Sequence, residues 1–173
     1  VCRILLALIS EYDVKVASIT GGSLRNAIPF EAEAEILVPC ADASKVRKLV
    51  EAKFAESKFE YRYSDPDATM SCVKLPAPAP RYISPKVISN AVKAILACPH
   101  GVERMSDTLP GLTETSTNMA MVRTGKGHLT VTSLTRSSID SAKMALSDSI
   151  RSVFELAGAK YTTSGGYSGW TPV

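Results

Sequence analysis

Asn26 and Arg136 are the residues of this 173-residue chain whose types and positions point most directly to a binding site. Asn26 lies in the turn-prone start of the stretch GGSLRNAIPFEAEAEILVP, just before a run of alternating residues. Arg136 follows a second strand-like run and precedes a helix start at Asp140. A guanidinium group binds a carboxylate through two charge-assisted hydrogen bonds, and an amide both donates and accepts. The two residues therefore suggest an edge that holds a small peptide by its terminal carboxylate and a carbonyl. A bend with a structural Asn and a solvated or ion-paired surface Arg remain the alternatives.

The other polar residues do not form a self-sufficient active site. Three glutamates alternate along one strand face, where solvation explains them: Glu31, Glu33 and Glu35. The opposite face of this strand is expected in a core, and it carries Phe30, Ala32, Ala34, Ile36 and Val38. Three serines flank a helix start, where capping is their ordinary use: Ser137, Ser138 and Ser141. The chain contains no nucleophile elbow, no phosphate-binding loop and no H-E-x-x-H motif. The sequence therefore predicts no catalytic residue of its own.

Metal-ligand spacing is also missing from the sequence. Neither His100 nor His128 has a second ligand type at a useful spacing, and no two cysteines are spaced as C-x-x-C. Cys2 and Cys98 adjoin apolar helical runs and are interpreted as buried small residues. The sequence therefore predicts no zinc site within this chain, and it favours reduced thiols without excluding disulfides.

Composition favours a soluble globular protein and disfavours two other classes. Hydrophobic residues make up 45% and charged residues 21%, which is ordinary for such a protein. The net charge is only +3 and the basic residues are scattered, which argues against a nucleic-acid surface. The opening run VCRILLALIS is too short to span a membrane and lacks the features of a signal peptide. We expect a cytoplasmic protein without membrane or nucleic-acid partners, and a chain excised from a longer one.

Residue periodicity predicts the elements that would position the two site residues. Helices are expected at the start of the chain, over 41–57, from Ser84–Pro85 to Pro99, and from Asp140 to Gly158. Strands are expected over 14–19, 30–38, 71–75, 119–123, 128–134 and 160–163, with a hairpin tip at 125–127. A proline-rich linker at 75–80 would separate two similar halves. This order predicts an α+β fold, an antiparallel β-sheet with helices packed on one face, of ferredoxin-like character.

Five segments resemble a known family. They are GGSLRNAIPFEAEAEILVP at 21–39, PHGVERMSD at 99–107, TETSTNMAMV at 113–122, SLTRSSIDSAK at 133–143 and LAGAKYTTSGGYSGWTP at 156–172. In this order they resemble segments of the bacterial aminoacyl-histidine dipeptidases, cytosolic dinuclear zinc peptidases that cleave Xaa-His and other dipeptides. The segment 51–80 matches poorly.

The resemblance implies that residues 1–173 are one inserted lid and dimerisation domain, cut from a longer enzyme. Two zinc ions would be bound by a separate catalytic domain that is absent here, and the chain alone would be inert. Asn26 would hydrogen-bond the dipeptide near its scissile or terminal group, and Arg136 would grip its terminal carboxylate. Arg25 is interpreted as structural, with a charge that orients the turn or pairs with a carboxylate such as Glu114. The implied partners are a dipeptide substrate, the enzyme's own catalytic domain and a second copy in a homodimer.

Two alternatives to this reading stay open. One is the lid of a related zinc amidohydrolase, such as a deacetylase or desuccinylase. The other is a free-standing ferredoxin-like module that binds a small ligand or pairs with itself.

Overall fold

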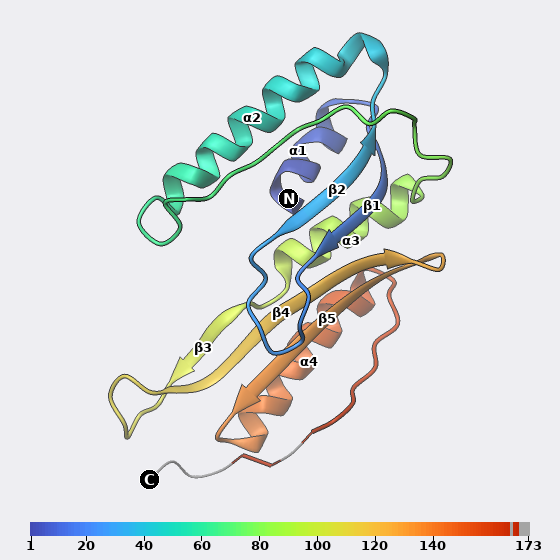
Figure 1. Ribbon diagram of the computed structural model, residues 1–173. Coiled ribbons are helices and arrows are strands. Elements are labelled where there is room, and N and C mark those ends of the chain that lie inside the picture. The colour runs from blue at the N-terminus through green and yellow to red at the C-terminus, as the bar shows by residue number, and fades with distance from the viewer. Residues whose placement is uncertain (167, 170–173) are drawn as a thin grey trace. The chain divides into compact units, whose positions relative to one another are not determined.

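The computed structural model of the chain, shown in Figure 1, describes residues 1–166, 168 and 169. The end of the last family-like segment, at 167 and 170–172, lies outside the described residues. The elements follow one another as α1 (Cys2–Glu11), β1 (Lys15–Gly21), β2 (Ala32–Leu37), a short 3-10 turn (Cys40–Asp42), α2 (Ala43–Glu60), α3 (Pro85–Ala97), β3 (Gly101–Met105), β4 (Thr113–Gly125), β5 (His128–Ser137) and α4 (Asp140–Leu156). The strands form one sheet in the order β2-β1-β4-β3, and β5 also pairs with β4. The expected α+β class with an antiparallel sheet is confirmed.

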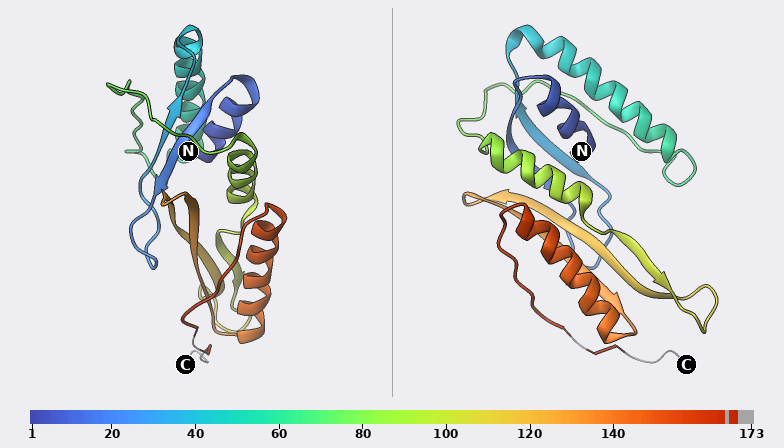
Figure 2. Two further views of the ribbon diagram at one scale, coloured as in Figure 1. Left: turned by 90° about the vertical axis from the view of Figure 1, so that its right-hand side faces the viewer. Right: turned by 180° about the vertical axis from the view of Figure 1, so that it is seen from behind.

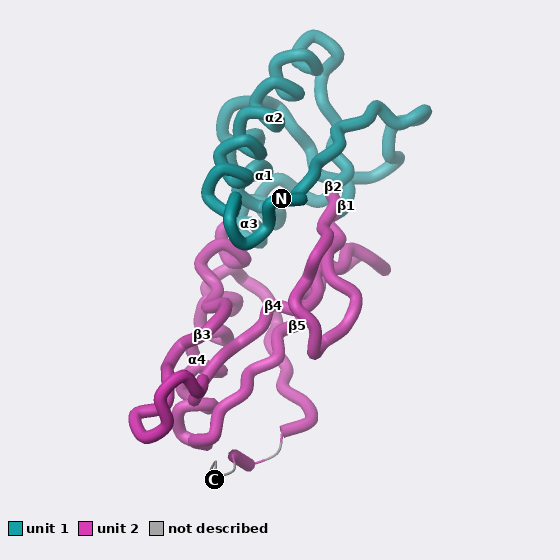
Figure 3. Tube along the Cα trace, turned by 60° about the vertical axis from the view of Figure 1, so that its left-hand side comes forward, with its two compact units in different colours: residues 1–18, 34–92 teal, residues 19–33, 93–173 magenta. Residues whose placement is uncertain are grey.

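The chain divides into two compact units, which Figure 3 colours separately. Unit 1 contains residues 1–18 and 34–92, and unit 2 contains residues 19–33 and 93–173. The proline-rich segment 75–80 therefore lies inside unit 1 and does not separate two halves. No described helix is long and apolar enough to cross a membrane.

The core of unit 1 forms where α1 meets α2. The buried faces of both helices have the predicted spacing, with Leu8 from α1 packed with Val46 and Val50 from α2. The segment 71–75, expected to be a strand, is coil. Its Cys72 carbonyl accepts a hydrogen bond from the Arg47 guanidinium, so a side chain, and not a neighbouring strand, binds its backbone.

Unit 2 is built on the long β4–β5 hairpin. Its tip is Lys126-Gly127, and both residues have positive φ angles, 51° and 79°, as a tight hairpin turn requires. Helix α4 packs on one face of this hairpin, and Leu146 and Ile150 meet Cys98 and Met119 there. The predicted hairpin is confirmed, although both strands run several residues further than expected.

The ends of the helices follow local rules. Pro85 is the first residue of α3, where its missing amide hydrogen costs nothing. Asp140 is the first residue of α4, and hydrogen bonds from Lys143 and from the Gly169 amide lower the pKa of its carboxyl. Gly158 ends α4 with a φ of 83°. The strand expected over 160–163 is coil, which the Tyr161 hydroxyl ties to Ser147 of α4 at 3.0 Å.

The alternating segment after Pro29 differs in part from expectation. Strand β2 begins only at Ala32, and the Phe30 side chain, expected in a core, is 83% exposed. The Glu31 carbonyl accepts the Gly22 amide at 3.1 Å, which closes a loop and keeps Phe30 out of the strand. Strand β3 was not predicted, since all five of its residues are exposed and leave no alternating pattern.

Candidate functional site

The connection between β1 and β2, residues 22–31, carries Asn26 and is called here the 22–31 loop. Its first residue, Gly22, has a φ of 66°. A Cβ atom at this position would lie 1.9 Å from the carbonyl oxygen of Ala120 on β4. The loop can therefore leave β1 at this angle only with glycine, which explains part of the Gly21-Gly22 pair seen in the sequence.

Two side chains of β4 bind the backbone of this loop and its entrance. The Arg123 guanidinium donates to the carbonyl of Gly21 at 3.1 Å and also to the carbonyl of Gly22. The Asn118 amide nitrogen donates to the carbonyl of Ala27 at 2.6 Å. The loop is consequently attached to β4 both at its base and next to Asn26.

Strand register places Arg136 on the same face of the hairpin as this attachment. Arg136 lies opposite Ser116, and Leu134 lies opposite Asn118. Directly opposed residues share a face, and so do residues two apart along a strand. The other face meets α4 through Met119. Figures 1 and 2 show the same arrangement, with the 22–31 loop on one side of β4–β5 and α4 on the other.

Asn26 and Arg136 are exposed, and neither side chain has a hydrogen bond or ion pair with any described residue. Ser116 and Asn118 are separated by about 7 Å along the strand, so the attachment point of the loop is close to the cross-strand neighbour of Arg136. Arg136 lies within β5 and not after the strand's end, as the sequence had suggested. An exposed guanidinium on the strand face to which the loop is attached is suited to bind an anion.

Arg25 also differs from one expectation. Glu114, its suggested partner, instead lies 3.6 Å from the Arg104 guanidinium. Arg25 is exposed on the 22–31 loop, and within the described part of the chain it makes no ion pair. Its interpretation as a structural residue gains no support from a contact.

The 22–31 loop exposes large apolar side chains as well as polar ones. Leu24 is 60%, Ile28 is 77% and Phe30 is 83% exposed. These residues flank Asn26 on both sides in the sequence. An apolar surface around a polar group is typical of a binding site that closes against another surface. The alternating pattern had assigned Phe30 to a core and so concealed this feature.

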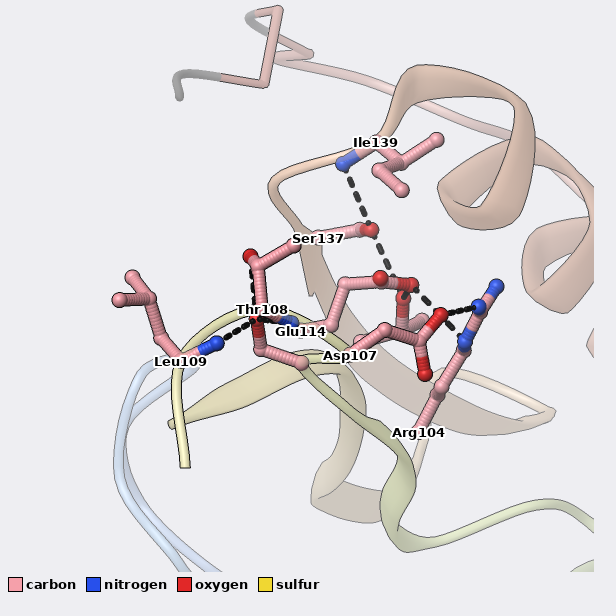
Figure 4. Close-up of polar contacts among 9 residues, drawn as sticks. Arg104, Asp107, Thr108, Leu109, Glu114, Ser137 and Ile139 are labelled. Carbon is pink, nitrogen blue, oxygen red and sulfur yellow. Dashed lines mark hydrogen bonds and ion pairs between the residues drawn. The ribbon is translucent and has the colours of Figure 1, made fainter. Parts of the chain in front are cut away.

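A second polar cluster, shown in Figure 4, joins the β3–β4 connection to the end of β5. The buried Glu114 carboxylate accepts from the Thr115 hydroxyl at 3.3 Å and lies beside Arg104, which also pairs with Asp107. The Thr115 and Ser137 hydroxyls are 2.8 Å apart, and Ser137 accepts the Ile139 amide at 3.0 Å. These groups satisfy one another, so the cluster fixes the chain directly after Arg136.

The described residues contain no group of three or more His, Cys, Asp or Glu side chains placed to hold a metal ion. His100 makes a structural contact with the sheet, since its Nδ1 atom accepts a hydrogen bond from the Met119 amide of β4 at 3.1 Å. All four cysteines are free, and burial raises the pKa of the Cys98 thiol to about 11. These residues do not fit a dinuclear zinc centre, and no metal-dependent step can be derived from them.

No protein-family model matches the chain. The chain is nevertheless homologous to one region of the dipeptidases, a class of peptide hydrolases. It is 32% identical over 170 residues to the cytosol non-specific dipeptidase of Escherichia coli (strain K12), covering 98% of this chain. The crystal structure of the aminoacylhistidine dipeptidase from Vibrio alginolyticus matches 99% of this chain, with a TM-score of 0.94 and 34% identity. In both cases the chain spans 35% of the relative. The resemblance seen in the sequence is thus confirmed, for a chain about a third as long as its relatives.

Proposed function

We propose that this chain is the lid and substrate-binding domain of a zinc-dependent dipeptidase that hydrolyses Xaa-His and other dipeptides. The observation that carries the proposal is the close match, with a TM-score of 0.94, of nearly all of this chain to a third of a dipeptidase. The placement of Asn26 and Arg136 toward one face of the β4–β5 hairpin supports it. Both relatives are dipeptidases, which favours dipeptide hydrolysis over deacetylation or desuccinylation.

In this proposal Arg136 binds the terminal carboxylate of the dipeptide. A guanidinium that meets a charge at this point selects dipeptides, because a longer peptide places its carboxylate elsewhere. Asn26 donates or accepts a hydrogen bond near the scissile or terminal group of the same substrate. Both residues act by binding and orientation, and neither takes part in proton transfer.

The remaining parts of the reaction are assigned outside these 173 residues. The described residues offer no metal-binding cluster, so the zinc ions are proposed to be held by a separate catalytic domain. The apolar side chains around Asn26 would help this chain to exclude water when it closes over that domain. The chain alone is proposed to be inactive. A cytoplasmic location and a homodimer complete the proposal.

The first prediction tests Arg136 in the full-length enzyme. Arg136→Ala should lower kcat/KM for free-acid dipeptides about 30- to 5,000-fold, because the substrate carboxylate loses its partner. This factor corresponds to a loss of about 2–5 kcal/mol of transition-state stabilisation. For dipeptides whose terminal carboxylate is amidated, the wild type and the variant should be nearly equal. Steady-state kinetics with both substrate forms measures this difference.

Arg25→Ala is the matched control, since Arg25 is another exposed arginine of unit 2 without an ion pair to a described residue. It should change kcat/KM much less than Arg136→Ala does. If Arg136→Ala lowers activity equally for free-acid and amidated dipeptides, Arg136 does not recognise the carboxylate.

A further inference from the structure

We propose that Asn118 of β4 is a positioning residue, which sets where Asn26 stands relative to Arg136. Its amide nitrogen donates to the carbonyl of Ala27 at 2.6 Å, and Ala27 directly follows Asn26. This inference rests on the proposed role of Asn26 in substrate binding. Asn118 itself is not proposed to touch the substrate.

The middle of the 22–31 loop has little else to hold it. Its residues 23–26 are all exposed, so burial does not stabilise them. Its own hydrogen bonds are from Gly22 to Glu31 at 3.1 Å and from Ala27 to Leu24 at 3.3 Å. Among the described side chains, Asn118 alone bonds the loop between residues 23 and 30. A loop with so few contacts would sample many conformations without this bond.

The amide oxygen of Asn118 gives a second reason to assign the residue to the bond with Ala27. Its Oδ1 atom is buried and has no hydrogen-bond partner among the described residues. A buried acceptor without a partner destabilises a fold, and an apolar side chain of similar size would avoid that cost. The amide is therefore best explained by what its nitrogen does at Ala27.

The register connects this bond to the second site residue. Asn118 lies opposite Leu134, and Ser116 lies opposite Arg136. The anchor of the loop and the strand position of Arg136 thus belong to one rigid ladder. Binding groups held at a fixed separation before the substrate arrives lose less entropy on binding.

Asn118→Asp tests the inference, since the shape is kept while the donor is replaced by a carboxylate oxygen that repels the Ala27 carbonyl oxygen. Amide hydrogen exchange should be at least about tenfold faster at Ala27, while Gly22 and the β4–β5 amides keep their protection. In the full-length enzyme kcat/KM should fall about 10- to 100-fold, and the Asn26→Ala, Asn118→Asp double variant should be no worse than Asn26→Ala.

Ser133→Ala is the matched control. The Ser133 hydroxyl is the other buried side-chain atom without a partner among the described residues, and it lies on β5 opposite Met119, on the face that meets α4. Removing it should change neither the exchange at Ala27 nor the kinetics.

Unchanged exchange at Ala27 in Asn118→Asp would overturn the inference, and so would additive losses in the double variant. Lost protection along the whole hairpin would also overturn it, because Asn118 would then be a general stability residue. If Asn26→Ala leaves activity intact, the proposed function of Asn26 fails, while the exchange at Ala27 still decides whether Asn118 holds the loop.

Discussion

Gly22 shows how strongly one residue limits the 22–31 loop. We predict that Gly22→Ala destabilises the protein by more than about 2 kcal/mol, since the new Cβ would meet the Ala120 carbonyl at 1.9 Å and the φ of 66° is unfavourable for alanine. Urea unfolding monitored by circular dichroism measures the change. Gly125→Ala is the control, because a Cβ there meets nothing within 4 Å. Similar unfolding midpoints for the two variants would contradict the steric argument.

At the residue scale the sequence identified the two exposed residues proposed to bind the substrate, but not the residues that hold the loop. Asn26 and Arg136 stand out through their type and their place beside strands. Arg123 and Asn118 bind backbone carbonyls that are 102 and 91 residues away in the chain. A backbone carbonyl has no residue-specific signature, so no pattern of residue types could reveal these contacts. These contacts can be identified only from the pairing of β4 with β1 and β5 in the structure.

Among the elements, the sequence predicted best those whose buried faces repeat regularly. Helices α1 to α4 were expected from their apolar spacing and from helix-ending or helix-starting residues such as Gly158 and Pro85. Strand β3 was missed because it has no buried side to create alternation. The segment 160–163 has strand-like residues but finds no neighbouring strand, and a helix contact through Tyr161 fixes it instead. Tertiary pairing decided these short segments, and local preference did not.

Cys98, just after α3, gives the core of unit 2 a dependence on pH. Burial raises the pKa of its thiol to about 11 in the folded protein, from an ordinary value of 9.0. The folded state therefore keeps a proton that the unfolded state releases, and this contribution to stability is complete below pH 9 and is lost as the pH rises toward 11. We predict that the difference in unfolding free energy between the wild type and Cys98→Ala shrinks over this range. Denaturant unfolding at several pH values measures it, and parallel pH profiles would contradict it.

For the whole molecule, the free edge of β5 predicts self-association. This ten-residue strand pairs with β4, and no other described strand pairs with it. An unpaired edge rich in β-forming residues readily pairs with a second copy. We predict a dimer in light scattering whose population rises with concentration, and Thr130→Lys, at an exposed edge position, should weaken it about tenfold or more. A clean monomer at high concentration would argue against this edge as the dimer contact.

The attachment of the 22–31 loop also determines which of its residues can change during evolution. Both β4 side chains grip main-chain oxygens, so the attachment does not depend on which residues the loop displays, glycine at its first position excepted. Mutations at Leu24, Asn26, Ile28 or Phe30 can therefore accumulate without unfastening the loop. Substitutions of the exposed loop side chains can therefore change what the loop binds, while the backbone conformation of the loop and its attachment to β4 stay the same.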